Sequence, residues 1–445
     1  MTNKSECRIG RPDCRYNMLD LKFIRENPDK VKTGLAAKRV TLDLDGLLLL
    51  DSHRRQLIVK MDDLKAKKNS ANDDISRLIK DKQDPKPFIA SMKTIAAQID
   101  ALGPQVKALD EQIQNILLFI PNVPHGTVPQ GGPEANQITA SWGDKPVFDF
   151  KPKSHIEIAE NLDIIDFKRG TKISGSNFVL YKGLGARLER ALYNFMLDLH
   201  TGQHGYREMS PPVVVNTASM TTTGQLPKMK DDMYALQGDD LYLIPTAEVP
   251  VTNIHRDEML NEEDLPLYYA AYTTCFRREA GSYGKDTRGL VRIHQFDKVE
   301  LVKFVSPENS YPELESLLAN ARRVFEILRV PHRVLALASG DLSFAAAKCY
   351  DIEVYAAGLD KWLEASSVSN FEDFQARRGN ISYKGKDGKK KGLVHTLNGS
   401  GVALPRTMVA ILENYQNAEG NVIIPEALRS YMGGLESITR RGGAL

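Results

Sequence analysis

Long hydrophobic runs and clustered cysteines are both missing from this chain of 445 residues. The longest unbroken apolar run covers residues 267–272. A membrane helix needs ~18 residues, so we expect no membrane span. The four cysteines, Cys7, Cys14, Cys275 and Cys349, form no CxxC pair. Their scatter excludes a disulfide scaffold, gives no support for a zinc site and indicates a reducing, cytoplasmic environment.

An excess of one charge is also missing, because 59 Lys and Arg stand against 57 Asp and Glu, a net charge of +2. A nucleic-acid partner would therefore need a local basic surface. Neither GxxxxGK[ST] nor GxGxxG occurs, so the two common nucleotide-binding folds are not supported. With 42% hydrophobic and 26% charged residues, the composition is that of an ordinary globular protein. At roughly 100–200 residues per domain, the length suggests two to four domains.

Composition and patterning divide the chain into segments. Residues 1–17 lack the apolar core of a signal peptide, whereas Met18 opens a well patterned stretch. We expect Met18 to be the natural start and residues 1–17 an unstructured extension; a short targeting peptide is the alternative. The further boundaries that we expect are an N-terminal domain at 18–120, a linker rich in Pro and Gly at 121–150, the domain that carries the chemistry at 151–435 and a tail at 436–445.

Residues 44–118 predict an antiparallel helical hairpin. Its apolar stripes follow alternating spacings of four and three from Leu50 to Leu78 and again from Phe88 to Ile116, which buries one helix face against a partner. The prolines of DKQDPKP, residues 81–87, separate the two helices. Roughly 35 residues at ~1.5 Å each give an arm of about 50 Å. Pro104 follows Gly103 and lacks a backbone donor, so we expect a kink or break there.

The first helix of this hairpin is locally basic. Its charged residues are Arg54, Arg55, Lys60, Lys65, Lys67 and Lys68 against Asp62 and Asp63. Such a run is either the solvated face of a coiled coil or a surface that contacts a phosphate backbone.

Beyond residue 150, helical stretches alternate with strand-like runs. The runs are VVVN (213–216), LYLIP (241–245), YYAAYTTCF (268–276) and DKVELVKFV (297–305). Several are joined by loops too short to contain a crossover helix. We therefore expect an α+β fold in which helices flank a mostly antiparallel sheet.

The string FRREAGSYGKDTRGL, residues 276–290, puts Arg277 and Glu279 at the end of a predicted strand, before a loop with Gly281, Gly284 and Gly289. A guanidinium is a planar fork that suits phosphate oxygens, and such a loop could close over a polyanion. The alternative is a β-hairpin with surface salt bridges.

Three further strings carry candidate ligand groups. In NGSGVALPR (398–406), glycines allow close backbone approach and Arg406 opens an apolar helix, where it must reach solvent or face an anion. Thr246-Ala247-Glu248 and Glu364-Ala365-Ser366-Ser367 combine carboxylates with hydroxyls, which suits magnesium held against phosphates. Taken singly, these strings are as well explained by loop caps and a Gly-rich helix start.

Together these segments are far more specific. From Met18 to about Met432 the chain resembles bacterial-type seryl-tRNA synthetases, a family of class II aminoacyl-tRNA synthetases. The resemblance rests on the hairpin and on TGQLPK (223–228), PTAEVP (245–250), the motif 2 string at 276–290, HQFDKVE (294–300), SNFEDFQARR (369–378) and the motif 3 region that begins with HTLNGSG (395–401). HQFDKVE and NFEDFQARR are the strings that point to serine within the class.

The resemblance implies that serine and ATP form seryl-adenylate and that the seryl group then moves to the 3′ end of tRNA(Ser). It leaves open whether tRNA(Sec) is also charged. The resemblance implies catalytic roles for Arg277, Glu279 and Arg406. It implies that ATP is bound by these three together with Arg278, Ile293, Phe296, Glu364, Ala365, Ser366 and Ser367, and that Glu364 and Ser367 also bind Mg²⁺. The serine-binding residues that it implies are Thr246, Ala247, Glu248, Arg277, Glu300 and Ser400. The implied tRNA contacts on the arm are Arg54, Arg55, Lys65 and Lys68. A homodimer and a cytoplasmic location are implied as well.

Some details depart from the family pattern, and two other classes stay open. Arg278 stands where the family often has a small residue, and KGKDGKKKG (384–392) is either a solvated hairpin tip or an acceptor-stem contact. A relative that loads a carrier protein would lack the arm. A non-catalytic RNA-binding paralogue would be expected to lose Arg277, Glu279, Glu300 or Arg406, and all four are present.

Overall fold

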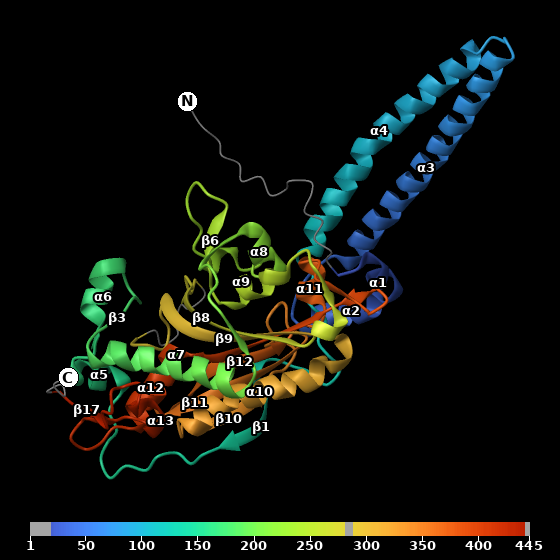
Figure 1. Cartoon of the computed structure of the whole chain (residues 1–445). Helices are drawn as coiled ribbons and strands as arrows, with labels where there is room; N and C mark the ends of the chain where they lie inside the picture. The colour runs from blue at the N-terminus through green and yellow to red at the C-terminus, as the bar shows by residue number, and fades with distance from the viewer. Residues whose placement is uncertain (1–18, 281–287, 441–445) are drawn as a thin grey trace, which may run out of the picture. The chain divides into compact units, whose positions relative to one another are not determined.

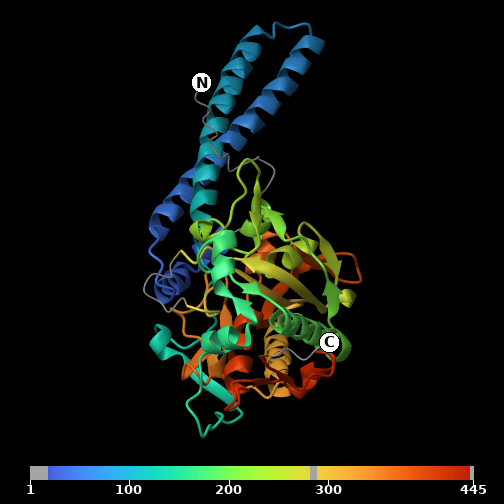
Figure 2. The same cartoon turned by 90° about the vertical axis from the view of Figure 1, so that its left-hand side faces the viewer.

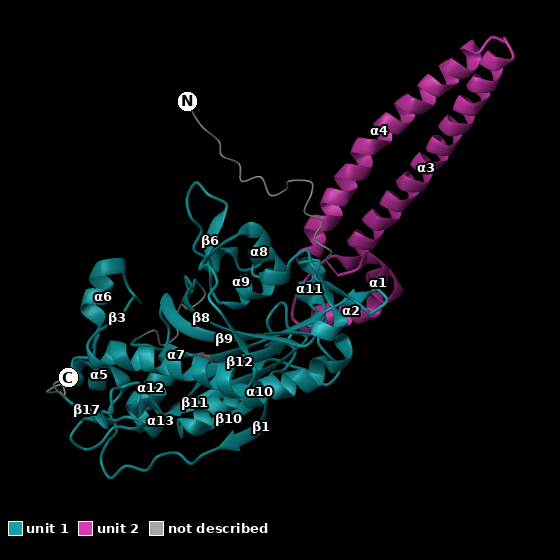
Figure 3. Ribbon diagram, in the orientation of Figure 1, with its two compact units in different colours: residues 1–17, 122–445 teal, residues 18–121 magenta. Residues whose placement is uncertain are grey.

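The computed structural model describes residues 19–280 and 288–440. It separates the chain into two compact units, one at residues 18–121 and the other beginning at residue 122 (Figure 3). The expected extension at 1–17 and the centre of the glycine loop at 281–287 lie outside the described residues. No helix in the described part of the chain is both long and apolar enough to cross a membrane.

The first unit is built on the predicted helical hairpin. Its elements are α1 (Leu21–Glu26), α2 (Pro28–Ala37), α3 (Leu44–Lys80) and α4 (Lys86–Leu117). The helices α3 and α4 run side by side as two arms of a hairpin in both views (Figures 1 and 2). Asp43 caps α3 by accepting a hydrogen bond from the Gly46 amide, which satisfies one of its free donors. The periodic stripe faces the seam, where Leu64, Leu102 and Ile113 are buried, so the hairpin prediction is confirmed.

Of the kink or break expected at Gly103–Pro104, the break is wrong, and the kink stays a prediction. The helix α4 continues through both residues to Leu117. Pro104 removes one intrahelical donor, but the buried stripe on either side, at Leu102 and Leu109, holds both halves of the helix against α3. Packing along the seam therefore outweighs the local helix-breaking tendency of proline.

The second unit is built on an eight-stranded sheet in the order β1-β10-β11-β12-β15-β9-β8-β4. All neighbours are antiparallel except β4 and β8. The strands are β1 (Gln137–Trp142), β10 (His332–Ala336), β11 (Lys348–Ala356), β12 (Lys361–Asn370), β15 (His395–Ala403), β9 (Gln295–Val305), β8 (Leu267–Phe276) and β4 (Arg207–Met209). The predicted α+β class with a mostly antiparallel sheet is confirmed.

Three helices cover one face of this sheet (Figure 1). They are α7 (Leu184–Gln203), α10 (Ser310–Ile327) and α12 (Leu404–Asn414). Along β9, Val299 and Leu301 belong to the core against these helices, while Lys298 and Glu300 point into a cavity on the other face. The period of two in a strand thus separates core from site.

Shorter elements complete the second unit. Three small sheets have two strands each and pair β2 (Ile165–Asp166) with β3 (Leu180–Tyr181), β5 (Val214–Asn216) with β6 (Leu241–Leu243), and β16 (Val422–Ile423) with β17 (Ser437–Ile438). In a fourth, β13 (Ser382–Lys384) lies between β7 (Met259–Asn261) and β14 (Lys390–Leu393). Its further α-helices are α5 (His155–Leu162), α6 (Phe167–Ser174), α8 (Thr217–Thr222), α9 (Glu248–Thr252), α11 (Phe374–Arg378) and α13 (Glu426–Arg429).

Two segments hold more structure than the sequence led us to expect. The expected linker at 121–150 contains β1, which pairs with β10 at the edge of the main sheet. The expected tail at 436–445 contains β17, which pairs with β16. An edge strand is paired on one side only, so its sequence carries a weak hydrophobic signal, and strands of two residues carry almost none.

Candidate active site

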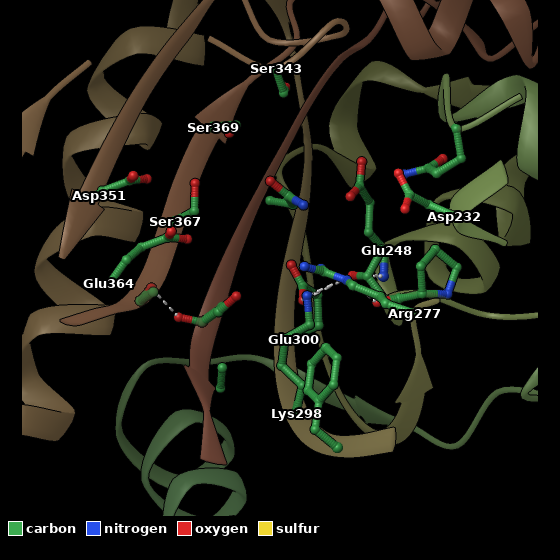
Figure 4. Close-up of a pocket in the computed structure, with 18 of the residues that line it drawn as sticks. Asp232, Glu248, Arg277, Lys298, Glu300, Ser343, Asp351, Glu364, Ser367 and Ser369 are labelled. Atoms are coloured by element: carbon green, nitrogen blue, oxygen red, sulfur yellow. Dashed lines mark hydrogen bonds and ion pairs between the residues drawn. The ribbon is translucent and has the colours of Figure 1, made fainter. Parts of the chain in front are cut away.

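A cavity of about 660 Å³ opens on the sheet face opposite α7, α10 and α12. Most of the predicted site residues line it. They are Thr246, Glu248, Arg277, Glu279, Ile293, Phe296, Glu300, Glu364, Ala365, Ser366, Ser367, Ser400 and Arg406. Residues as far apart in the chain as Thr246 and Arg406 therefore contribute to a single pocket. Figure 4 shows Glu364 and Ser367 on one side of the pocket and Arg277 and Glu300 on the other.

Two of the predicted ligand-binding residues do not line this cavity. Arg278 is exposed, and its backbone amide donates to the Asp232 carbonyl at 2.9 Å. Ala247 is fully buried behind the cavity wall, in the cluster that contains Tyr269 and Val302. The neighbours of both residues, Arg277 and Glu279 on either side of Arg278 and Thr246 and Glu248 on either side of Ala247, line the cavity instead.

One end of the cavity holds a buried ion pair. The Glu300 carboxylate is paired with Lys298, and their side chains are 1% and 6% exposed. Lys298 Nζ also donates to Thr246 Oγ1 at 2.7 Å, and Thr246 Oγ1 donates to Glu300 Oε2 at 3.2 Å. The other oxygen, Glu300 Oε1, is buried and has no hydrogen-bond partner among the described residues. A buried carboxylate oxygen without a partner is costly, so this atom is suited to accept a hydrogen bond from a ligand.

A second carboxylate lies beside this pair. Glu248 Oε1 accepts a hydrogen bond from Gln375 Nε2 at 2.6 Å, and Thr396 donates to the Gln375 oxygen at 2.8 Å. Burial, and next the charge of Glu300, raise the pKa of Glu248 to about 7 from its ordinary 4.5. Two acidic groups at this end of the cavity make it suited to a ligand cation.

Arg277 stands at the end of β8, directly beside the acidic end. Its Nε donates to the Pro245 carbonyl at 3.2 Å, and its Cζ lies 5.2 Å from the centre of the Phe296 ring. The guanidinium is therefore held by a carbonyl and an aromatic face. Glu279 accepts from Arg292 Nη1 at 2.7 Å. This arrangement leaves a positive group and a flat aromatic side chain in the same part of the cavity.

The opposite wall combines carboxylates and hydroxyls on β11 and β12. Ser367 is paired in register with Asp351, and both residues line the cavity with Glu364 (Figure 4). Burial, and next the charge of Glu364, raise the pKa of Asp351 to about 8. Arg406 Nη1 donates to the Glu364 carbonyl at 2.6 Å and lies 3.4 Å from Glu364 Oε2. A cation between Glu364 and Asp351 would relieve the repulsion that raises this pKa.

The described residues contain no group of three or more His, Cys, Asp or Glu side chains placed to hold a metal ion by themselves. Mg²⁺ binds hard oxygen ligands and usually takes only one or two carboxylates from the protein, with phosphates and water completing its shell. Glu364 and Ser367 supply such oxygens, so this wall fits Mg²⁺ that arrives with a phosphate ligand.

Ser400 lines the cavity beside Glu300. It pairs with Glu300 in the β15–β9 register, and its carbonyl accepts from Ser366 Oγ at 2.6 Å. This hydrogen bond joins β15 to β12, and the two strands carry residues of opposite ends of the cavity. A shift of one strand therefore moves both ends.

Sequence reasoning assigned no role to Lys298, Asp351 and Gln375. Lys298 lies two positions before Glu300, so the strand period could have placed it on the same face. Asp351 reaches Ser367 only through the β11–β12 register, which local patterns do not reveal. Gln375 belongs to the string SNFEDFQARR, but its partner Glu248 is 127 residues away in the chain.

The four predicted arm residues, Arg54, Arg55, Lys65 and Lys68, all lie on α3. Arg54 pairs with Asp110 of α4, and Arg55 Nε lies 3.4 Å from Asp51. Lys65 pairs at 3.3 Å with Asp62 one turn away, at the exposed surface. Arg54 thus connects the two helices of the hairpin, whereas Lys65 has only a local surface partner.

Comparison with known proteins identifies the class first. Residues 232–415 match the class II core domain of tRNA synthetases (G, H, P, S and T), and residues 18–124 match the seryl-tRNA synthetase N-terminal domain. With the antiparallel sheet and its cavity, these matches define a class II aminoacyl-tRNA synthetase.

Full-length relatives narrow the class. The chain is 54% identical to a serine–tRNA ligase of Geotalea uraniireducens and 55% identical to one of Geobacter sulfurreducens, each over 422 residues that cover 95% of this chain and 100% of the relative. The crystal structure of seryl-tRNA synthetase from Pyrococcus horikoshii complexed with ATP is similar, with a TM-score of 0.89 and 35% identity over 95% of this chain and 99% of that chain. The chain belongs to the seryl-tRNA synthetase family, the ATP-dependent serine–tRNA ligases.

Proposed function

We propose that the cavity binds ATP and serine side by side, forms seryl-adenylate and pyrophosphate, and then transfers the seryl group to the 3′ end of tRNA(Ser). The observation that carries this proposal is the buried Glu300 carboxylate, whose Oε1 has no partner among the described residues and lies in the cavity that Arg277 also lines. An amino acid that carries a hydroxyl donor matches this acceptor.

The roles at the serine end follow from charge. We assign the serine hydroxyl to Glu300 and Ser400, and the serine ammonium to Glu248, with Thr246 and the buried Ala247 shaping this wall. Alanine and glycine would leave Glu300 Oε1 without a hydrogen bond, and sites of this kind reject such analogues by about 10⁴–10⁵. Threonine keeps the hydroxyl, so its rejection depends on steric fit.

The roles at the ATP end follow from the positive groups. We assign the α-phosphate and the serine carboxylate to Arg277, the γ-phosphate end to Arg406, and the adenine to Phe296, Ile293 and Glu279. Ala365 and Ser366 shape the wall beside Glu364. Attack of a carboxylate on phosphorus needs no protein nucleophile; it needs in-line positioning and cations where negative charge develops.

Magnesium would be held at Glu364 and Ser367. When bound, the ion neutralises phosphate charge and helps to release pyrophosphate. The two side chains contribute one carboxylate and one hydroxyl, which orient the ion and hold it against the β12 wall.

Beyond the catalytic cavity, we propose that residues 18–120 bind tRNA(Ser) through Arg55, Lys65 and Lys68, and that residues 151–435 form the catalytic domain. Duplex RNA is recognised mostly by shape and by its phosphates, so exposed cations on a long hairpin are suitable contacts. Arg54 stays a candidate contact, although its ion pair with Asp110 ties it to the hairpin seam.

A homodimer and a cytoplasmic location belong to the same proposal, and light scattering on the purified chain tests the dimer.

A charging assay tests the transfer step. Radiolabelled serine should become attached to a tRNA with a long variable arm and not to a tRNA with a short one or to an acyl carrier protein. Charging of the carrier protein alone would contradict the proposal.

A further inference from the structure

His200 lies in the last turn of α7, on the side of the sheet that faces away from the cavity. It is fully buried, and its Nδ1 lies 3.0 Å from Nδ1 of His204. Its other ring nitrogen, Nε2, is buried and lies against the Gly401 backbone, without a hydrogen bond of ordinary geometry to any described residue. None of the roles proposed above uses this side chain.

The imidazole of His200 packs directly against Gly401 of β15. A Cβ placed on Gly401 would lie 3.1 Å from His200 Nε2 and 3.2 Å from Val299 Cγ1. Ordinary carbon contacts lie at ≈ 3.5–4.0 Å, so the ring and Val299 together occupy the space that a side chain would need. The His200 ring can therefore pack this closely because residue 401 has no side chain.

Gly401 is the extra residue of a β-bulge. The β15–β9 register runs from Ser400 opposite Glu300 to Val402 opposite Val299, which leaves Gly401 unpaired. Bulges bend a strand and redirect neighbouring side chains, and they are frequent beside active sites. Here the bulge follows directly after Ser400, which lines the cavity opposite Glu300.

His200 cannot serve as a proton carrier in this position. Burial, and next the nearby His204, lower the pKa of His200 to about 3, against a smaller opposite effect of the Gly401 backbone. The ring is thus neutral at physiological pH and acts through its volume and its position.

We infer that His200 is a positioning residue for the amino-acid end of the cavity: its ring supports the Gly401 bulge from behind and so sets where Ser400 stands relative to Glu300. This inference rests on the proposed function, because it assumes that serine binds between Ser400 and Glu300. It assigns a role in substrate binding to a helix that does not line the cavity.

The test is a double-mutant cycle read out by KM for serine in ATP–pyrophosphate exchange. Gly401→Ala adds a methyl group against the ring, and His200→Ala removes the ring. A displacement of about 1 Å at a binding residue can reduce rate up to about 10²-fold, so we expect each single variant to raise KM for serine about tenfold while KM for ATP changes less than about twofold. In the double variant the methyl group loses its close contact with the ring and keeps only the one with Val299, so KM for serine should return to within about threefold of the wild type.

His332 provides the matched control. It is also fully buried, and its Nε2 has no hydrogen-bond partner among the described residues, but it lies on β10 beside Trp142 and does not line the cavity. His332→Ala should lower the melting temperature as His200→Ala does, without raising KM for serine. His200→Gln, which keeps a nitrogen near the Nε2 position, should restore a near-normal KM and covers the case in which His200→Ala does not fold.

Equal KM values for serine in His200→Ala and His332→Ala would overturn the inference. It would also be overturned if Gly401→Ala raised KM for serine by the same factor in the wild-type background and in the His200→Ala background. If the wild-type chain shows no serine-dependent exchange at all, the proposed function itself fails. The two failures are therefore distinguishable in one experiment.

Discussion

The Glu300 carboxylate and the Lys298 ammonium form a buried ion pair in which only one carboxylate oxygen is used. Lys298 and Thr246 both contact Oε2, which leaves Oε1 for a ligand. The pair thus holds the Glu300 carboxylate in place while its second oxygen stays available.

Replacing Glu300 by Gln should selectively impair serine activation. The variant keeps the shape but leaves Lys298 without its counter-charge and weakens the acceptor for the serine hydroxyl, so we expect kcat/KM for serine to fall about 10²-fold. Glu313→Gln is the control, because it breaks another ion pair of a buried lysine, Lys303–Glu313 at 2.8 Å, outside the cavity. Steady-state exchange kinetics that show equal losses in both variants would contradict the role of Glu300.

The raised pKa of Glu248 predicts an acid limb in the pH profile. Below its pKa of about 7 the group is protonated and cannot pair with the serine ammonium, so kcat/KM for serine should rise as pH increases through about 7. The hydrogen bond from Gln375 lowers this pKa, so Gln375→Leu should move the limb to higher pH. A limb that stays in place in Gln375→Leu would assign it to another group.

The same shift predicts that stability and activity move in opposite directions. Burial disfavours the ionised form of Glu248, so the unfolded state loses this proton at lower pH than the folded state does. The folded state therefore loses stability as pH rises from about 4.5 to about 7, and above 7 the loss stays constant. Glu248→Gln removes this effect and should melt at a higher temperature than the wild type at pH 8, yet activate serine more poorly. Calorimetry at pH 5 and pH 8 measures the difference, which should be smaller at pH 5.

Arg277→Lys should slow adenylate formation. An ammonium cannot donate in a fork, and it loses the contact with the Phe296 ring at 5.2 Å, so we expect kcat for exchange to fall about 10²–10³-fold. Arg278→Lys should change kcat less than about threefold, because Arg278 is exposed and outside the cavity wall. An equally large loss in Arg278→Lys would return that residue to the ATP site.

Glu364→Gln should raise the magnesium concentration that gives half-maximal exchange by about tenfold, because a neutral amide is a poorer ligand for a hard cation. Glu353 is a matched control, since it is paired with Glu364 across β11 and β12 but binds Arg333 at 2.6 Å and does not line the cavity. Magnesium titration of Glu353→Gln should match the wild type; the same shift in both variants would argue against an ion at Glu364.

Much of the fold could be predicted because its signals are local. The apolar stripe from Leu50 to Leu78 repeats over many helical turns, and Pro85 and Pro87 mark the connection between the two helices. The predicted bounds of the hairpin therefore agree closely with those of α3 and α4. The break expected as one outcome at Gly103–Pro104 does not occur, because that expectation used local propensity alone, whereas α4 also packs along the seam with α3.

The site could be predicted only in part, because some of its contacts depend on strand register. Arg277, Glu300 and Arg406 came from motif strings, whereas the pairing of Asp351 with Ser367 comes from the alignment of two strands. The support of Gly401 by His200 joins residues about 200 positions apart and leaves no local pattern in the sequence. Long-range packing of this kind is visible only in the folded chain.

The central claim is that one cavity selects serine through Glu300 and activates it with ATP. ATP–pyrophosphate exchange without tRNA, with magnesium and with serine, threonine, alanine or glycine in turn, tests it most directly. The account predicts exchange with serine, weak exchange with threonine, and losses of about 10⁴-fold or more with alanine and glycine. Exchange with alanine or glycine but not with serine would contradict the account and remove Glu300 as the group that recognises the hydroxyl.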